Sequence, residues 1–423
     1  MTITGRGVRP LGRGGSFVAG ADDGEAFVYN PAGLADIDGV SLLIDGGLVL
    51  QRTHYDRVDS GGNKQPGVDG NYNFLPFPTL VVTYKPKKLP WVTFAGGVWV
   101  PYLGLNSYPA DGPQRYSSIS LDGSLVLVVQ LAAAFRIHEH FWLGVGLQNM
   151  VINFKSLLKL SACTELNCAP EDPNFDSLTE LNVHSTFTPS AVVGATLAYT
   201  KLRAGLTLQL PFFVNAEGQV RSKLPSDPFF ANAEVKGQSA SLSFTLPLIL
   251  RGGVEYRPMP TMRIEVGFDY EAWSMQKEFT IQPKGIYIDG VPGIGKYYLN
   301  TLHVPRNMQD SVALHIGGEY EAFKRHVVFR LGYLFETSAT PDETMSVLTS
   351  DGLHNMITVG MGVRMFGVRW DVGYGHMFTT DRTVTNSKSL QQNPIQPSLG
   401  VPVGNGTYKI DTDIVSVGLE TRF

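Results

Sequence analysis

The sequence is short of the features that most soluble and helical membrane proteins use. Only 17% of its residues are charged and only two are cysteines. No stretch approaches the run of about 20 apolar residues that a membrane-spanning helix needs, which argues against an α-helical membrane protein. The formal net charge of -4 gives no reason to expect nucleic acid as a partner. Residues 1–8 have no apolar core segment, so we expect that an export signal has been lost from the sequence as written.

The motifs of common enzyme classes are also missing. There is no Gly-x-Ser-x-Gly, no His-Glu-x-x-His and no Walker loop, and no histidine lies near the cysteines at zinc-like spacing. His138, Glu139 and His140 lie in a predicted short turn, where solvated polar residues are ordinary. We therefore expect no enzyme, no cofactor and no metal. A lipid hydrolase whose serine and histidine meet from neighbouring strands needs no local motif and stays a minor alternative.

The sequence does contain strong two-residue alternation, which is clearest at the C-terminus. One face of the last segment holds Val415, Val417, Leu419 and Phe423, and the other holds Ser416, Gly418, Glu420 and Arg422. A strand that lies between lipid and a polar lumen alternates apolar and polar residues in this way. The pattern predicts an all-β fold, a transmembrane antiparallel β-barrel.

Segments with this period recur along residues 40–423. About fourteen can be drawn, over residues 40–54, 75–86, 91–105, 117–137, 140–160, 183–200, 202–222, 235–257, 261–283, 308–322, 326–338, 352–365, 366–378 and 410–423. Short connections, such as those at 258–260 and 366–367, alternate with long polar ones. Outer-membrane barrels have short periplasmic turns and long external loops, so both ends of the barrel are expected to face the periplasm.

Several strands place ionisable residues on one face. Charged side chains facing lipid at mid-depth cost roughly 2 to 4 kcal/mol each for Arg or Lys, so this face must line the lumen. The residues predicted to face the lumen are Arg263, Glu265, Asp269, Glu271, Arg330, Arg364 and Asp371. Because charges of both signs occur, ion pairs that stiffen the wall are the ordinary interpretation; direct contact with a solute is the alternative.

Residues 1–39 do not alternate and form a separate segment. They are rich in Gly and Arg, then acidic at residues 22–25, and then contain a turn at residues 29–34 followed by a piece compatible with a helix. Such a segment could hang in the periplasm or plug the lumen. A barrel of about fourteen strands is wide enough to leak, which favours a plug, or hatch.

Several short runs occur in a fixed order along the sequence: Gly12-Arg13-Gly14-Gly15-Ser16-Phe17-Val18-Ala19, Asp22-Asp23, Asn30-Pro31-Ala32-Gly33-Leu34, Leu246-Pro247, Asp269-Tyr270-Glu271-Ala272-Trp273-Ser274, Phe329-Arg330-Leu331-Gly332-Tyr333, and Pro341-Asp342 followed by Asp351 and His354. In these runs and in their order the sequence resembles the FadL family of outer-membrane channels for long-chain fatty acids and other hydrophobic compounds. The resemblance implies fourteen strands, a lumenal hatch and passive transport. In the hatch, Asn30, Pro31 and Ala32 would fix the backbone rather than touch substrate.

A lateral gate is expected at the third strand, as the family's kink there implies. The residues assigned to it are Gly96, Gly97, Trp99, Pro101 and Gly104, with Trp99 facing the lumen. Adjacent glycines weaken a strand ladder, and proline lacks the N–H donor that a ladder needs. Pairing with a neighbour would then fail and open the wall. The alternative is that glycine is simply frequent here and Pro101 ends the strand.

An external groove for hydrophobic molecules is expected on two long connections. Its residues would be Phe175, Leu178, Leu181, Leu224, Phe229 and Phe230. Exposed paired phenylalanines on a loop favour a binding surface, and the alternative is that they pack on the barrel rim. In the same region Cys163 and Cys168 suit a small disulfide loop in an oxidising compartment, with free thiols as the alternative.

Together these features predict a monomeric outer-membrane channel, surrounded by outer-membrane lipid, for passive uptake of hydrophobic small molecules such as long-chain fatty acids or hydrocarbons. Capture on external loops, transfer to a lumenal pocket and sideways exit at the third strand would be the route. The main alternative is a barrel that docks or assembles exported proteins, which a sealed third strand and loops without an apolar groove would favour. A water-filled porin is the third possibility, against which a packed hatch would argue.

Overall fold

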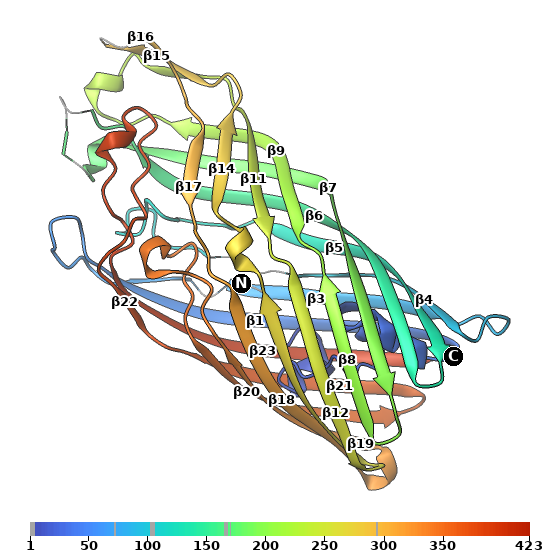
Figure 1. Cartoon of the computed structure of the whole chain (residues 1–423). Helices are drawn as coiled ribbons and strands as arrows, with labels where there is room; N and C mark the ends of the chain where they lie inside the picture. The colour runs from blue at the N-terminus through green and yellow to red at the C-terminus, as the bar shows by residue number, and fades with distance from the viewer. Residues whose placement is uncertain (1–4, 72, 102–105, 165–167, 170, 293–294) are drawn as a thin grey trace.

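The structure, a computed structural model, describes residues 5–71, 73–101, 106–164, 168–169, 171–292 and 295–423. A large tilted sheet winds round and closes on itself (Figure 1). It closes where β1 (Val40–Arg57) pairs antiparallel with β23 (Gly406–Arg422), in continuous register from Ser41 opposite Arg422 to Arg57 opposite Gly406. Closure leaves no free sheet edge at this seam, as a membrane barrel requires.

Fourteen antiparallel spans form the wall within the described part of the chain, which confirms the predicted strand number. Between β1 and β23 they are β3 (Asn73–Tyr84), β4 (Val92–Trp99), β5 (Leu125–His138), β6 (Phe141–Ser161), β7 (Asp176–Ala198), β8 (Leu202–Gln209) with β9 (Phe212–Lys223), β11 (Ser239–Leu246) with β12 (Ile249–Met259), β13 (Met262–Glu271) with β14 (Glu278–Pro283), β17 (Leu302–Pro305) with β18 (Ser311–Ala322), β19 (Val327–Glu336), β20 (His354–Met365) and β21 (Val368–Thr379). Pro211 and Pro247, which have no N–H to donate, separate β8 from β9 and β11 from β12.

Smaller elements decorate the end that carries the long connections. They are β2 (Val68–Asp69), β22 (Arg382–Val384), a three-stranded sheet of β10 (Glu234–Lys236), β15 (Tyr287–Val291) and β16 (Gly295–Tyr298), and the 3-10 helices η2 (Pro173–Phe175), η3 (Pro228–Phe230), η6 (Asp342–Thr344) and η7 (Pro397–Leu399). The helix η4 (Trp273–Met275) lies within a wall span instead, between β13 and β14. The helix η5 (Phe323–Arg325) lies in a short turn at the other end. Across the described residues, none of the helices has the length and apolarity to cross a membrane.

Side chains along each wall strand alternate between an outward and a lumenal face, as the two-residue pattern predicted. Outward side chains are apolar and exposed, as for Ile316 (48%), Leu331 (64%) and Val417 (58%), whereas Glu265 (0%) and Arg330 (4%) are buried inside. Short turns, such as residues 139–140 and 366–367, lie at one end together with both ends of the barrel, where the Val40 and Phe423 backbones hydrogen-bond each other. We call this the short-turn end and the opposite one the long-loop end.

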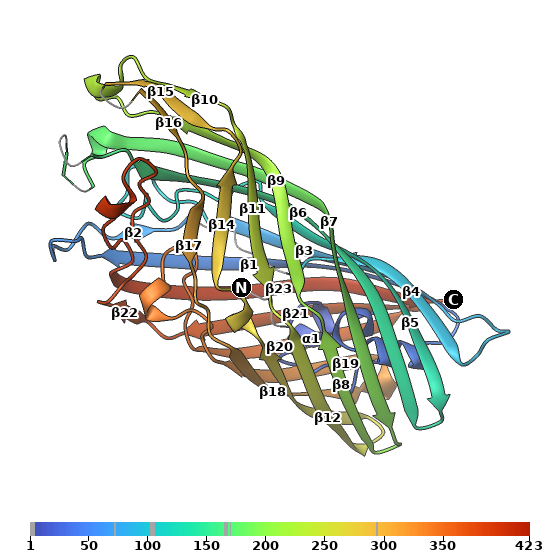
Figure 2. The same ribbon diagram turned by 45° about the horizontal axis from the view of Figure 1, so that its top comes forward.

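The N-terminal segment forms a hatch inside the barrel, near the short-turn end (Figure 2). It contains α1 (Val8–Gly12), α2 (Ala26–Tyr29) and the 3-10 helix η1 (Pro31–Asp36), and most of its residues are buried. The wall comes close enough to need glycine: a Cβ at Gly144 would lie 2.2 Å from the Ala32 nitrogen. The predicted plug is therefore confirmed over the described residues of this segment.

Candidate functional site

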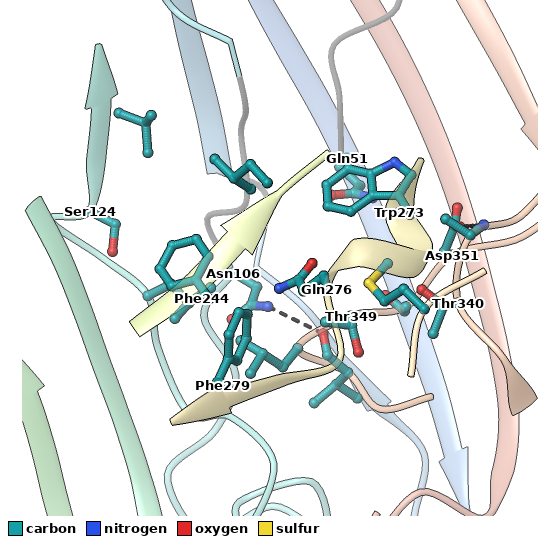
Figure 3. Close-up of a pocket in the computed structure, with 18 of the residues that line it drawn as sticks. Gln51, Asn106, Ser124, Phe244, Trp273, Gln276, Phe279, Thr340, Thr349 and Asp351 are labelled. Atoms are coloured by element: carbon teal, nitrogen blue, oxygen red, sulfur yellow. Dashed lines mark hydrogen bonds between the residues drawn. The ribbon is translucent and has the colours of Figure 1, made fainter. Parts of the chain in front are cut away.

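An apolar cavity lies in the lumen, on the long-loop side of the hatch. Figure 3 shows residues that line it. Its volume is about 320 Å³, within the usual range for small-molecule sites. Most of its lining is aliphatic or aromatic, and the apolar lining residues include Pro76, Val100, Tyr108, Leu121, Leu125, Val126, Ile152, Phe154, Phe244, Leu246, Trp273, Phe279, Met308 and Val347. Phe244 and Phe279 pack edge to face, with ring centres 5.1 Å apart.

One side of this cavity carries a polar pair. His354 Nε2 lies 2.7 Å from Asp351 Oδ1, and the Ala339 backbone N–H donates to the same carboxylate. Burial alone would raise the pKa of Asp351, but the hydrogen bonds, first of all that with His354, hold this pKa below its ordinary value. Asp351 and His354, which the family resemblance had singled out, thus lie in the cavity wall.

Within the described residues, the wall is interrupted beside the cavity, beyond the end of β4. The ladder runs without slips from Tyr84 opposite Phe94 to Thr79 opposite Trp99, and β5 pairs with β4 over the same length. The break expected at Gly96 and Gly97 is therefore wrong, since both residues are paired on both sides. Gly97 instead allows β3 to lie close to it, because a Cβ at this position would lie 2.2 Å from the Leu80 carbonyl oxygen.

The strand instead ends at Trp99, and Val100 and Pro101 leave the wall. As predicted, Trp99 faces inward: it is 1% exposed and its Nε1 donates to Gln130 Oε1 at 3.0 Å. The hatch reaches this point, because the Arg6 guanidinium lies 4.4 Å from the Trp99 ring centre and Arg6 Nη2 donates to the Pro101 oxygen at 2.8 Å. Gly104 lies outside the described residues.

Beyond Trp99 the flanking strands lose their β4 partner. Within the described residues, Leu75, Pro76 and Phe77 of β3 pair with β1 alone, and Leu125 of β5 pairs with β6 alone. Pro76 is exposed on the outward face of β3, and Leu125 is 56% exposed on the outward face of β5. Both also line the cavity, which therefore reaches the outer surface between these two strands.

The hatch is held by ion pairs to lumenal acids, of which Glu265 was predicted and Glu255 and Glu319 were not. Arg13 is fully buried, and its guanidinium lies 2.9 Å from Glu265 Oε2, 3.0 Å from Glu255 Oε2 and 3.1 Å from Glu319 Oε1. Glu265 also accepts hydrogen bonds from the backbone of Val18 at 2.8 Å. Lumenal charges were predicted to pair with one another along the wall, and here they also hold the hatch to the wall.

The other predicted lumenal residues also face inward, at different depths. Arg263 pairs with Asp22 of the hatch at 2.7 Å, and Arg330 pairs with Asp371 at 2.7 Å. Asp269 and Glu271 are buried on the same face of β13. Arg364 differs, because it lies at the short-turn rim with 45% of its side chain exposed and pairs with Glu321.

Asn30 ties the hatch to β7. Its Oδ1 accepts from the Ala32 backbone N–H at 3.1 Å, and its Nδ2 donates to the Val18 oxygen at 2.9 Å and to Thr196 Oγ1 at 3.0 Å. Pro31 begins η1, where its fixed φ and missing N–H fit the first helical position. None of these three hatch residues is among the described residues that line the cavity.

The external groove is not an exposed surface, so that prediction is wrong. Phe175 and Phe230 are 5% and 3% exposed, and Leu224 and Phe229 pack against the same cluster beneath the long-loop cap. Leu181 is buried on the lumen side of β7, whereas Leu178 lies on the opposite face by parity. The phenylalanines therefore pack on the rim, because they gain more by covering one another than by staying in water.

The cysteines lie beside this cluster. A disulfide joins Cys163 and Cys168, as the sequence suggested. Asn393 Nδ2 donates to the Cys163 oxygen at 2.8 Å, which ties the disulfide loop to the connection between β22 and β23. The pair therefore organises the long-loop cap and does not reach the cavity.

Sequence reasoning missed most of the cavity. It assigned apolar residues to lipid, but β11 reverses this order: Leu242, Phe244 and Leu246 point inward while Ser243 is exposed. The signal was present, since residues 239–246 alternate small polar with large apolar side chains. Met308 and Val347 could not have been found by parity, because they lie on connections that fold back into the lumen.

Comparison with known proteins shows which protein family and which solved structures the chain resembles. The sequence profile of the family described as outer membrane protein transport protein (OMPP1/FadL/TodX) matches residues 7–423. Among solved structures, a FadL homologue from Pseudomonas aeruginosa has a TM-score of 0.82 at 16% identity, covering 100% of this chain and 99% of that one. The toluene transporters TodX of P. putida and TbuX of Ralstonia pickettii have TM-scores of 0.71 and 0.66, at 12% and 15% identity, each covering 100% of this chain and 99% of theirs.

No curated protein matches the sequence. The structural likenesses are at low identity and show the fold, whereas the profile match spans almost the whole chain. The closed barrel of fourteen spans, the lumenal hatch and the profile agree with one another. The chain belongs to the FadL/TodX family of outer-membrane transport proteins.

Proposed function

We propose that this protein is a passive channel through which hydrophobic molecules enter the cell, and that it acts as a monomer surrounded by outer-membrane lipid. A molecule enters at the long-loop end, occupies the apolar cavity and leaves sideways through the interruption beyond Trp99. The observation that carries this proposal is that Pro76 and Leu125, which face outward on the two edges of the interruption, also line the cavity.

The height of the interruption supports a lateral exit. Pro76 pairs with Leu48, whose side chain faces outward with 39% exposure in the apolar belt of β1. An opening at this level faces hydrocarbon rather than water. Each methylene that stays out of water on such a route keeps about 0.8 kcal/mol, so a sideways path favours apolar cargo.

The hatch supports the same route by filling the alternative one. Its buried helices and ion pairs occupy the lumen on the short-turn side of the cavity. A straight aqueous path to the periplasm would require these contacts to break. A water-filled porin is therefore disfavoured, and the relatives that are described as toluene transporters are consistent with apolar cargo.

The docking alternative finds little support. It would favour a third strand sealed to its neighbours, but β4 stops at Trp99 while β3 and β5 continue. It would also favour loops without an apolar groove, and the burial of Phe175 and Phe230 does agree with that. Since the cavity and its opening serve no purpose in docking, uptake is the better account of the two.

Replacing Leu125 by tryptophan tests the exit. The larger ring would fill the opening between β3 and β5, so uptake of a radiolabelled long-chain fatty acid or of toluene by cells that express the protein should fall several-fold. Leu131→Trp is the matched control, because Leu131 faces outward on the same strand where β4 is still paired. Equal uptake by both variants at equal amounts of folded barrel would contradict the lateral route.

A further inference from the structure

Neighbouring spans of the wall, from β7 to β18, are interrupted along one continuous line. Val192 of β7 pairs with Gln209 of β8, Gln209 with Ile249 of β12, Ile249 with Glu271 of β13, and Glu271 with Ser311 of β18. Each of these is the last pair of its ladder toward the long-loop end. Because each residue pairs directly with the next, the ladders all stop at the same level. We call this line the crease.

Beyond the crease, each span resumes pairing only after a break. Pro211 and Pro247, which have no N–H to donate, lie in the breaks between β8 and β9 and between β11 and β12. Residues 272–277, which include η4, separate β13 from β14, and residues 306–310 separate β17 from β18. In β7, residues 185–190 have no ladder partner on the side of β9 within the described structure.

The strands beyond the crease form a sheet that is paired within itself. β9 pairs with β11, β11 with β14 and β14 with β17, and these four strands lie side by side in Figure 1. β7 joins them at one side through residues 178–184. At the other side β17 is an edge, because within the described residues it pairs with β14 alone. We call β9, β11, β14 and β17 the flap.

The crease borders the apolar cavity. Trp273 and Gln276 from one break and Met308 from another line the cavity, as do Phe244 and Leu246 of the flap. A close-packed core resists bending of the wall in front of it, but behind the crease there is free volume. Bending at the crease also leaves the ladders on either side of it intact. The wall is therefore weakest where it covers the cavity.

Contacts between two long connections hold the flap against the rest of the long-loop end. Tyr297 lies on β16, in the connection between β14 and β17, and its hydroxyl donates to the Pro394 oxygen at 2.9 Å. Ile288 of β15 and Ile395 belong to one apolar cluster beside this hydrogen bond. A single hydrogen bond and non-directional apolar contacts can separate and form again without unfolding either side.

We propose that the flap tilts about the crease and thereby opens and closes the cavity toward the long-loop end, where cargo enters. This inference rests on the proposed function, because it describes the control of access to the same cavity. The four strands of the flap move as one body, since their ladders with one another stay paired. The strands below the crease stay fixed, because they belong to the closed barrel.

Distances between two spin labels on the purified full-length protein in lipid bilayers test the motion. Gln282→Cys on β14 and Tyr256→Cys on β12 place exposed labels on opposite sides of the crease, and the native cysteines are joined in a disulfide. We expect two populations of distance, with a ratio that changes when palmitate is added. The control pair of Tyr256→Cys and Ile316→Cys lies below the crease and should give one narrow distance throughout. One narrow distance across the crease would overturn the hinge, and a ratio that palmitate leaves unchanged would overturn its control of access.

Tyr297→Phe tests what holds the flap closed. Loss of the hydrogen bond to Pro394 should raise the ratio of open to closed protein about two- to tenfold. Tyr298→Phe on the same strand is the matched control, because Tyr298 is 59% exposed and its hydroxyl makes no hydrogen bond in the described structure. The same ratio in both variants would overturn the assigned contact.

A second measurement covers the case in which the labelled variants do not fold. In the unlabelled protein, Tyr297→Phe should speed hydrogen exchange at residues 272–277 and 306–310 and leave the ladder between β9 and β11 unchanged. No change at these two breaks would overturn the hinge.

The outcomes also separate this inference from the proposed function. A flap that moves, in a protein whose Leu125→Trp variant takes up cargo as well as Leu131→Trp does, would leave the hinge standing and overturn the lateral exit. A rigid flap, in a protein that Leu125→Trp blocks, would overturn the hinge and leave the exit standing.

Discussion

The two halves of the lumen are built from opposite chemistry. On the short-turn side, Arg9 and Arg13 of the hatch meet Glu265 and Glu319 of the wall in buried ion pairs. On the long-loop side, the cavity is lined by aromatic and aliphatic residues such as Phe244 and Phe279. The same barrel therefore encloses a charged, filled half and an apolar half with free volume.

The two kinds of contact, ion pairs and apolar packing, suit the two halves of the lumen to different tasks. Buried ion pairs need good geometry to offset the loss of water, so they fix the hatch in one position. Apolar contacts are not directional and tolerate ligands of different shape. One half thus closes the barrel, and in the proposed route the other half accepts a flexible molecule and passes it to the interruption beyond Trp99.

The largest effect is expected from Arg13→Met, which tests whether ion pairs hold the hatch. Glu255, Glu265 and Glu319 would lose their shared cation, at a cost of about 3 to 5 kcal/mol for a broken buried pair. Urea unfolding of the purified barrel should show the loss, and cells should become permeable to a polar dye. Arg364→Met, at the exposed rim, should change neither. Unchanged stability in the Arg13 variant would mean that apolar packing alone positions the hatch.

A smaller effect is expected from Asn30→Ala. The variant loses hydrogen bonds to Val18 and Thr196 and leaves buried groups unsatisfied, which should cost about 1 to 3 kcal/mol. The hatch should loosen without leaving the lumen, because its ion pairs remain. Hydrogen exchange should then rise across the hatch and little elsewhere. Protection equal to that of wild-type protein would show that Asn30 does not hold the hatch to β7.

Arg6→Ala probes the link between the two halves. Arg6 joins the hatch to Trp99 and Pro101, where the wall opens, and its loss should cost about 1 kcal/mol. Hydrogen exchange at residues 98–100 should accelerate, and flux of a hydrophobic solute should change. If exchange at these residues stays as in wild-type protein, the hatch and the interruption are not coupled through Arg6.

The smallest effect on binding is expected from Phe230→Ser. Phe230 packs against Phe175 and Phe229 in the long-loop cap and is not part of the cavity lining within the described residues. Proteolysis of the cap should become faster, while affinity for a long-chain ligand should change by less than about 0.5 kcal/mol. A large loss of affinity would restore the external groove that the sequence suggested.

The sequence allowed the barrel to be predicted because its signal is local and repeated. Two-residue alternation assigned Glu265 and Arg330 to the lumen correctly, since the pattern can be seen within each strand alone. The predicted strand boundaries were wrong beside the interruption in the wall. The third segment was expected to reach residue 105 but ends at Trp99, and the fourth begins at Leu125 rather than near residue 117. Alternation of side chains continues beyond the ends of these two wall strands, because side-chain pattern does not report hydrogen bonding.

The candidate site was less predictable, because it is assembled from distant connections. Met308 gave no local signal, and its place in the cavity lining depends on a fold that brings it to the same cavity as Phe279 and Thr349. The phenylalanines of the cap gave a signal that pointed the wrong way, since exposure on a loop cannot be read without knowing what packs over it. Long-range packing, rather than strand pattern, therefore decided where the site is.

Anomalous diffraction from crystals grown with a fatty acid brominated at the end of its chain would test the lateral route most directly. We predict bromine peaks in the cavity and between Pro76 and Leu125, where the chain would pass from lumen to lipid. Peaks that run instead beside the hatch toward Arg369 at the short-turn end, with none between β3 and β5, would contradict it.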